Sequence, residues 1–196
     1  PHADSSFFGP NASKDEVYTQ VLEQARGLVY DQRNWEDAKR NSNFSNVASL
    51  LWHAYAALPA PSSSVNWAGF YIRSDKFPAL SKDTTAAAAG ATTVQPKLLL
   101  GPFQGRPACQ EIRFGKGVCG TAAQDRATVV VPDVLEFPGH IACDASSRSE
   151  IVVPILVGGE TVAIIDVDCT EPSGFDETDK KYLEELAGLL AECCDW

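Results

Sequence analysis

The sequence predicts an α+β domain in which helices pack on a mostly antiparallel sheet. Helical patterns lie at both ends of the chain, strand patterns are grouped between them, and a hairpin signal divides the most apolar segment. The chain has 196 residues, of which 44% are hydrophobic and 21% charged, so it is long enough to bury a core as one domain. We assign residues 13–194 to this domain and residues 1–12 to a loose N-terminal arm.

Three long helices are expected. Ser13 and Glu16 have the spacing of a capping box, and apolar residues recur behind them at helical spacing. A second apolar stripe starts near Ser45 and ends before Pro59, which stops a helix. A third stripe covers 176–190 near the C-terminus, and a short helix is expected at 117–125.

The strand patterns lie between these helices. They cover residues 64–72, 97–100, 111–114, 127–131, and the two arms 150–157 and 160–169. The last two are joined by Gly158-Gly159, which is a hairpin signal. We interpret residues 73–96, which are rich in Ala, Thr and Pro and have no clear period, as a long surface loop, and residues 101–117 as mainly loop.

The charge balance excludes several classes of partner. The net charge is -10, whereas nucleic acids and anionic membranes require a basic surface. The most apolar region, 151–167, is interrupted by Pro154 and Gly158-Gly159, so no segment reaches spanning length. No export signal is visible. We therefore expect a cytoplasmic protein, present also in the nucleus if the source is a eukaryote.

Asp166 and Asp168 are difficult to explain as packing residues. Positions two apart in a strand share a face, so both carboxylates point the same way while Ile165 and Val167 point the other way. Two like charges near the end of an apolar strand are unfavourable unless they share a cation or a proton. The alternative is that this end of the strand is exposed to water.

Trp67 and Tyr71 also share one face of a strand, with Gly69 between them. Two aromatic rings separated by a residue without a side chain form a shallow box that suits a methyl group, a thioether or a soft cation. Ordinary core packing explains the same pattern.

The cysteines allow several interpretations. Cys119 lies near an expected helix start beside Lys116, so local electrostatics alone favours it over Cys143 as the more acidic thiol. A zinc site made of Cys109, Cys119, Cys143 and His140 has suitable ligand types but lacks the close cysteine pairs of structural zinc sites. Buried, inert thiols are the simplest alternative.

Taken together, the motifs resemble a known family. The segments "NWAGFYI", "LLLGPFQGRPACQEIRFGKGVCGTAA", "VPDVLEFPGHIACDASSRSEIVVPI" and "AIIDVDC…FDETDKKYLEEL" are similar to those of free methionine-(R)-sulfoxide reductases, which are built on a single GAF domain. The similarity runs over about residues 13–192 and is interrupted mainly by 73–96. Three cysteines fall outside the cysteine pattern of the family: Cys169, Cys193 and Cys194.

The resemblance implies a six-stranded antiparallel sheet and the reduction of free L-methionine (R)-sulfoxide, with thioredoxin as electron donor. It implies no metal and no bound organic cofactor, and it is compatible with a homodimer. By motif position Cys143 resembles the attacking cysteine, Cys109 the resolving one and Cys119 a third that substitutes for it in some members. The implied substrate-binding residues are Trp67, Tyr71, Glu150, Asp166 and Asp168.

The expected reaction forms a sulfenic acid on Cys143 and then a disulfide with Cys109 or Cys119. Asp166 or Asp168 is expected to donate the proton, because crowded carboxylates have raised pKa values. Two other functions are compatible with a GAF domain. One is a small-molecule sensor that tolerates loss of its cysteines, and the other is a peroxide sensor whose disulfide is the signal.

Overall fold

The computed structural model describes five stretches of the chain: residues 8–9, 11–30, 38–77, 97–140 and 144–196. Cys143 lies outside the described residues, as do most of the predicted arm and residues 78–96 of the predicted surface loop. Among the described residues, no helix is both long and apolar enough to cross a membrane.

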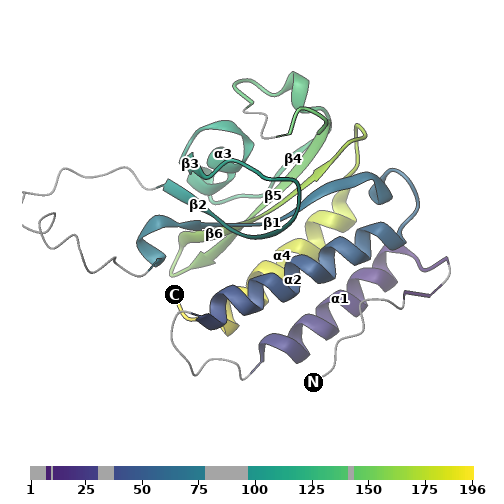
Figure 1. The fold of residues 1–196 in the computed structure, drawn as a ribbon, viewed down its shortest axis with the longest axis horizontal. Helices are drawn as coiled ribbons and strands as arrows, with labels where there is room; N and C mark the ends of the chain where they lie inside the picture. Colours follow the sequence, from purple (N-terminus) through teal and green to yellow (C-terminus); the bar gives the residue numbers. More distant parts are fainter. Residues whose placement is uncertain (1–7, 10, 31–37, 78–96, 141–143) are drawn as a thin grey trace, which may run out of the picture.

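One antiparallel sheet of six strands forms the centre of the described structure, which confirms the predicted fold class (Figure 1). The strands follow the order β3-β2-β1-β6-β5-β4 across the sheet, so β1 and β6 lie at its middle. Their bounds are β1 Val65–Arg73, β2 Lys97–Gly105, β3 Glu111–Arg113, β4 Val129–Val131, β5 Ser149–Val157 and β6 Glu160–Cys169.

The helices cover the two faces of the sheet unequally. Their bounds are α1 Lys14–Val29, α2 Ala38–Ala57, α3 Gly117–Asp125 and α4 Glu177–Cys193. Helices α2 and α4 pack against one face, with α1 lying across both of them, whereas α3 packs on the opposite face (Figure 1). The sheet therefore lies between two hydrophobic clusters, and the cluster under α3 contains fewer residues.

Local sequence signals set the helix ends. The backbone N–H of Ser13 donates to Glu16 and the Ser13 hydroxyl accepts from the backbone of Glu16, which completes the predicted capping box. Helix α2 begins at Ala38, well before the predicted start near Ser45. Residues 38–44 have few apolar side chains, but Phe44 is fully buried and stacks on Phe70 of β1 with ring centroids 4.2 Å apart. This tertiary contact extends the helix beyond its visible apolar stripe.

Strand β2 is longer than predicted. Glycine and proline at positions 101 and 102 indicated a loop, but the strand continues to Gly105 because its second half pairs with β1. Gly105 lies opposite Trp67 and Phe103 lies opposite Gly69, and a shift in register beyond Gly69 accommodates the irregular segment.

The β5–β6 hairpin has the predicted two-residue turn. Gly158 and Gly159 have φ values of +59° and +79°, the left-handed conformations that a type I′ turn requires. This turn fixes the register of the two strands, so that Glu150 of β5 lies opposite Asp168 of β6 and Val152 lies opposite Asp166. The hairpin thereby brings Glu150 of β5 beside Asp166 and Asp168 of β6.

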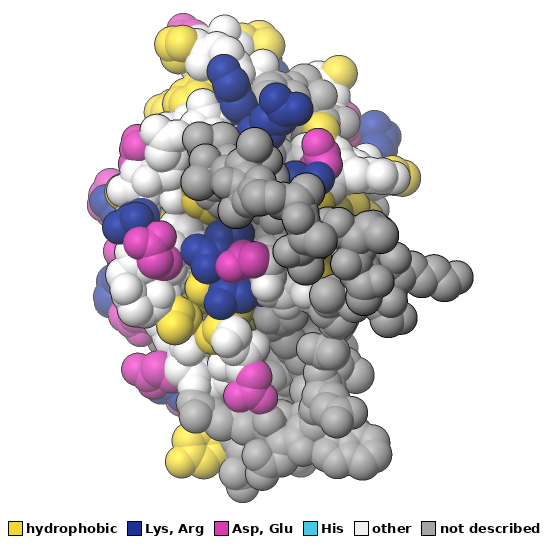
Figure 2. Space-filling view, turned by 90° about the vertical axis from the view of Figure 1, so that its left-hand side faces the viewer, with side chains coloured by type: hydrophobic (Ala, Val, Ile, Leu, Met, Phe, Trp, Pro, Cys, Tyr) yellow, Lys and Arg dark blue, Asp and Glu magenta, His cyan; other side chains and the backbone are white. Residues whose placement is uncertain are grey.

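Figure 2 shows a face of the molecule on which acidic and basic side chains lie next to one another over the part that is described. Ion pairs among the described residues follow the same pattern: Arg73 contacts Asp75 and Lys97 contacts Glu111, each at 2.7 Å. The described part of this face therefore has no continuous basic surface of the kind that nucleic acid binding requires.

Candidate active site

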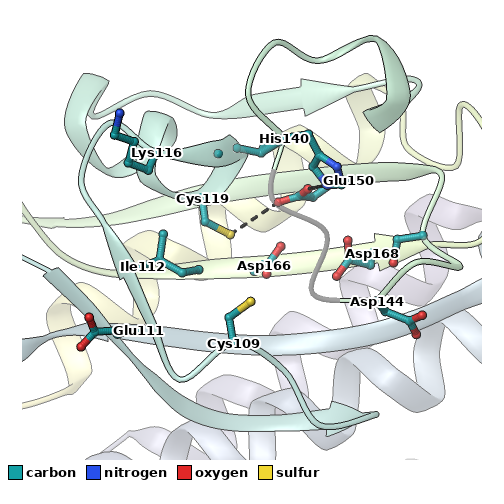
Figure 3. A pocket seen from close by; sticks show the side chains of 13 residues that line it. Cys109, Glu111, Ile112, Lys116, Cys119, His140, Asp144, Glu150, Asp166 and Asp168 are labelled. Atoms are coloured by element: carbon teal, nitrogen blue, oxygen red, sulfur yellow. Dashed lines mark hydrogen bonds and ion pairs between the residues drawn. The ribbon is translucent and has the colours of Figure 1, made fainter.

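The three predicted carboxylates converge on the sheet face covered by α3 (Figure 3). Asp166 and Asp168 point to this face, whereas Ile165 and Val167 belong to the core on the helical side, as the alternation of the strand predicted. Glu150 and Asp166 are each only 5% exposed, and Asp168 is partly buried. Such burial of carboxylates is rare unless they are paired.

Crowding and burial change the protonation of this cluster. Burial raises the pKa of Glu150 well above its usual value, and the negative charges of Asp166 and Asp168 raise it further. Burial, Asp166 and Asp144 act in the same way on the pKa of Asp168. Burial also raises the pKa of Asp166, to about 7, and hydrogen bonds with Cys119 and Glu150 limit the increase. The cluster therefore holds protons near neutral pH until a cation enters.

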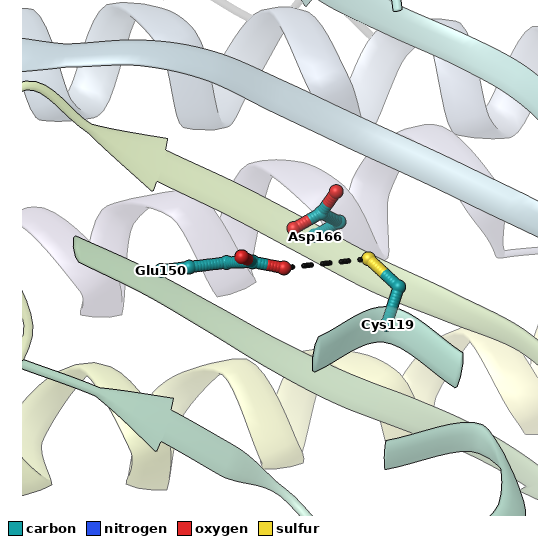
Figure 4. Close-up of side chains that lie close together, drawn as sticks. All are labelled: Cys119, Glu150 and Asp166. Atoms are coloured by element: carbon teal, nitrogen blue, oxygen red, sulfur yellow. Dashed lines mark hydrogen bonds between the residues drawn. The ribbon is translucent and has the colours of Figure 1, made fainter. Parts of the chain in front are cut away.

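Cys119 contacts this cluster directly. Its Sγ lies in the first turn of α3 and donates to Oε1 of Glu150 at 3.4 Å, with Asp166 beside both groups (Figure 4). Burial raises the pKa of the thiol well above its usual value, and the charges of the surrounding carboxylates raise it further. The helix start and Lys116 therefore do not make Cys119 an acidic thiol, because burial beside carboxylates outweighs the helix dipole. The comparison with Cys143 stays a prediction, since that residue lies outside the described ones.

His140 reaches the same cluster from another side. Its Nε2 lies 3.7 Å from Oε2 of Glu150. Burial lowers the pKa of His140, so near neutral pH the imidazole is uncharged and this contact is not an ion pair. His140 therefore lines the site and contributes a ring nitrogen that carries no charge near neutral pH.

These side chains line a small pocket with a volume of about 60 Å³ (Figure 3). The buried carboxylates, Cys119, Cys109 and Ile112 all line this pocket. Cys109 is disulfide-bonded, whereas Cys119, Cys169 and Cys193 are free thiols. The pocket thus combines an acidic wall with a disulfide-bonded cysteine.

Trp67 and Tyr71 lie on the same face of β1, as predicted, but protein atoms fill the box between their rings. The rings stack on each other with centroids 5.8 Å apart, and Trp67 also stacks on Phe103 at 5.2 Å. A Cβ added to Gly69 would lie 2.3 Å from Cβ of Phe103, so the space above this glycine is occupied by protein atoms. Both aromatic residues are almost fully buried. Their expected contact with substrate stays a prediction.

The alternative zinc site is only partly assembled among the described residues. Cys109, Cys119 and His140 all line the pocket, and Cys143 lies outside the described residues. The group whose ligand atoms lie mutually close, within 4.8 Å, is instead Cys119, Glu150 and Asp166.

Asn66 is a site residue that the sequence did not indicate. Its Nδ2 donates to Oδ2 of Asp144 at 3.2 Å and to Oγ of Ser147 at 3.1 Å, and both of these acceptor residues line the pocket. A break in the β1–β6 register between Val65 and Trp67 coincides with this position. Strand alternation alone does not give the direction of a side chain at such a bulge.

Asp144 differs from Glu150, Asp166 and Asp168 in that its pKa is lowered. The backbone N–H and the hydroxyl of Ser146 both donate to its Oδ1, at 2.9 and 2.7 Å, and this is the main cause of the shift. Asn66 and Arg106 add smaller contributions. Asp144 is therefore ionised at neutral pH, directly after the segment 141–143 that the structure does not describe.

Comparisons with known proteins agree with this fold and site. A sequence profile of the GAF domain matches residues 68–193. The free methionine-R-sulfoxide reductase of Saccharomyces cerevisiae is 45% identical over 194 residues, which cover 98% of this chain and 94% of the yeast protein. The corresponding reductase of Escherichia coli is 40% identical over 178 residues, covering 91% of this chain and 88% of that protein.

A solved structure gives the same result. The free methionine-R-sulfoxide reductase of Neisseria meningitidis, solved in complex with its substrate, is 35% identical with a TM-score of 0.75 over 96% of this chain and 95% of that one. The resemblance noted in the motifs is thus confirmed over nearly the whole chain. The chain belongs to the GAF-domain family of free methionine-R-sulfoxide reductases.

Proposed function

We propose that this chain reduces free L-methionine (R)-sulfoxide to L-methionine. The observation that carries the proposal is the convergence of Glu150, Asp166 and Asp168 on a pocket that also contains Cys109. Three neighbouring buried carboxyl groups favour a cationic ligand, because a cation stabilises their ionised forms. The ammonium of a free amino acid supplies that charge.

The same charge requirement explains a preference for the free amino acid. A methionine sulfoxide inside a peptide has an amide in place of the ammonium, so it would leave Glu150 and Asp166 buried without a cation. The E. coli and N. meningitidis relatives, both named as free methionine-R-sulfoxide reductases, support this reading of the pocket.

In the proposed reaction the thiolate of Cys143 attacks the sulfur of the sulfoxide. The sulfoxide oxygen takes a proton from Asp166 and is transferred to Cys143, which becomes a sulfenic acid as methionine leaves. The substrate sulfur gains the two electrons that Cys143 loses. Asp166 is the preferred donor because its pKa of about 7 suits proton transfer near neutral pH.

Cys109 is the proposed resolving cysteine. Its thiol condenses with the sulfenic acid of Cys143, releasing water and leaving a disulfide, which the dithiol of thioredoxin then reduces. The disulfide-bonded state of Cys109 supports this role, and the raised pKa of Cys119 disfavours it as an attacking thiol. Recycling by thioredoxin fits a reducing compartment such as the cytoplasm.

A coupled assay tests the proposal. Purified protein is incubated with thioredoxin, thioredoxin reductase and NADPH, and NADPH loss is followed separately with free L-methionine (R)-sulfoxide, its (S) epimer and peptide-bound sulfoxide. We expect consumption with the free (R) form alone. No consumption with any substrate, while the reductant reduces a control disulfide, would refute the proposal and favour a small-molecule sensor. Consumption with peroxide but with no sulfoxide would favour the peroxide sensor.

A further inference from the structure

The side chains of Cys119, Glu150 and Asp166 form a group with the composition of a metal site (Figure 4). Each offers one ligand atom, and these atoms lie within 4.8 Å of one another. The three residues come from three different elements, α3, β5 and β6, which are packed against one another in the core under α3. The fold therefore holds the ligand atoms near one another before any ion arrives.

An unpartnered oxygen points to a missing ligand at this place. Asp166 is only 5% exposed, and its Oδ1 is buried without a hydrogen-bond partner among the described residues. A buried carboxylate oxygen without a donor is costly, and a bound cation would satisfy it. This observation is independent of the sulfur–carboxylate contact, and it concerns a side chain that lines the pocket.

The distance between two of the ligand atoms is compatible with zinc. Tetrahedral zinc with a bond of about 2.3 Å to sulfur and about 2.1 Å to oxygen would separate the two ligand atoms by about 3.6 Å. The observed distance from Sγ of Cys119 to Oε1 of Glu150 is 3.4 Å. A thiolate with two carboxylates matches a borderline-soft cation better than magnesium or calcium, which prefer oxygen alone. Three protein ligands leave a fourth coordination position, which water would take.

We propose that, in the reduced protein, Cys119, Glu150 and Asp166 bind one zinc ion, which competes with the substrate ammonium for the acidic wall of the pocket. The ion replaces the proton that Cys119 now shares with Glu150, so binding releases protons to solvent. Zinc is thus an inhibitor of this site and takes no part in the proposed reaction. The competition rests on the proposed function, whereas the metal site itself does not.

The test uses the reduced full chain and cadmium, a zinc analogue whose bond to a thiolate gives an ultraviolet charge-transfer absorption. We expect one equivalent to bind with this absorption, and zinc to displace it. The absorption should be lost in Cys119→Ser. Zinc affinity should also fall in this variant, by more than about 100-fold, because loss of an outer-shell partner alone costs about 10- to 100-fold. Asp166→Asn should weaken binding without removing the sulfur band.

Cys193→Ser is the matched control, because Cys193 is also a buried free thiol but belongs to the core on the other side of the sheet. It should bind cadmium like the unchanged protein. An undiminished band in Cys119→Ser would overturn the proposal, since the metal would then lie on other cysteines. Absence of saturable binding in the unchanged protein would overturn it as well.

Competition is measured in the same titration on Cys143→Ser, which by the proposed function binds free L-methionine (R)-sulfoxide without reducing it, by adding that sulfoxide. We expect saturating sulfoxide to raise the apparent Kd for cadmium at least about tenfold, as mass action requires for a shared site. Simultaneous binding of both ligands without a change in either Kd would refute the shared site. If calorimetry without metal detects no sulfoxide binding, the proposed function fails, while the metal site is still judged by the cysteine variants.

Discussion

The thiol of Cys119 donates a hydrogen bond to Oε1 of Glu150, 3.4 Å away, in the buried wall of the pocket. The thiol can donate only while it is protonated, and burial together with the nearby carboxylates raises its pKa. A neutral thiol is a poor nucleophile. This contact therefore gives Cys119 a different chemical state from Cys109, which lines the same pocket and is disulfide-bonded.

The two cysteines are expected to behave differently when replaced. Cys119→Ser keeps a hydroxyl that can donate to Glu150, so steady-state turnover should fall by less than about tenfold, the cost of one ordinary hydrogen bond. Cys109→Ser should form about one methionine per enzyme and then stall, because no disulfide is made. Rapid-quench counting of methionine separates the two results. Continuous cycling in Cys109→Ser and a stall in Cys119→Ser would instead identify Cys119 as the resolving cysteine.

Glu150→Gln removes a charge from the acidic wall while keeping the shape of the side chain. Loss of one partner of a buried charge pair costs about 2–5 kcal/mol, so KM for free methionine (R)-sulfoxide should rise by at least about 30-fold. N-acetylmethionine sulfoxide, which lacks the ammonium, is the control and should be an equally poor substrate for both proteins. A variant with an unchanged KM for the free amino acid would show that Glu150 does not bind the ammonium.

The acidic cluster should make the unliganded protein less stable as pH rises. The pKa of Asp166 is about 7 in the folded protein, and in the unfolded chain it is near 4, so the folded state holds more protons between these values. The free energy of unfolding should therefore fall from about pH 4 to about pH 7, by a few kcal/mol. Urea unfolding at several pH values measures this slope.

Asp166→Asn is the matched variant for this experiment, because it cannot ionise. Its slope between about pH 4 and about pH 7 should be shallower than that of the unchanged protein. Glu150 and Asp168, whose pKa values are also raised, leave part of the slope in place. A slope that Asp166→Asn does not alter would contradict the raised pKa of Asp166.

The sequence predicts most of the sheet because its strands follow simple alternation. Asp166 and Asp168 were placed on one face by their spacing, and the Gly158-Gly159 turn indicated the hairpin that carries them. The sequence does not show which strand lies next to which. The contact of Glu150 with Cys119 depends on how α3 packs on the sheet, and the local pattern around Cys119 contains no information on that packing.

Two differences between the expected and the observed structure have related causes. An open box between Trp67 and Tyr71 requires that no side chain from a neighbouring strand occupies the space above Gly69. Phe103 of β2 occupies that space. The end of β2 was missed because pairing with β1 holds a segment that contains Gly101 in strand conformation. In each case a partner that is distant in sequence decides the local structure.

Asn66 is expected to act as a positioning residue. Its amide holds Asp144 and Ser147 together beside the segment that contains Cys143. Asn66→Ala should lower kcat for free methionine (R)-sulfoxide by about 10- to 100-fold, because small displacements of reacting groups are costly, while KM changes less. Asn66→Asp, which cannot donate and adds a charge beside Asp144, should be at least as slow. A rise in KM with kcat unchanged would indicate a direct substrate contact instead.

A second buried acid, Asp179, joins the N-terminal helix to the rest of the fold. Its Oδ2 accepts from Nζ of Lys14 at 2.6 Å, and its Oδ1 accepts from the hydroxyl of Tyr18 at 2.8 Å. Asp179 is fully buried, and burial raises its pKa while these donors limit the increase. The carboxylates of Asp179 and Asp176 raise the pKa of Lys14, against the effect of its own burial.

Lys14→Met should therefore destabilise the protein by leaving the Asp179 carboxylate without its cation. We expect a loss of about 2–3 kcal/mol, less than the 3–5 kcal/mol of a fully buried pair, because the Lys14 side chain is 19% exposed. Lys180→Met is the control: Lys180 lies 4.0 Å from the exposed Glu177, and such pairs contribute little. KM should stay unchanged in both variants, since Asp179 lies on the opposite side of the sheet from the pocket. Equal stability of the two variants in urea unfolding would show that the ion pair does not anchor α1.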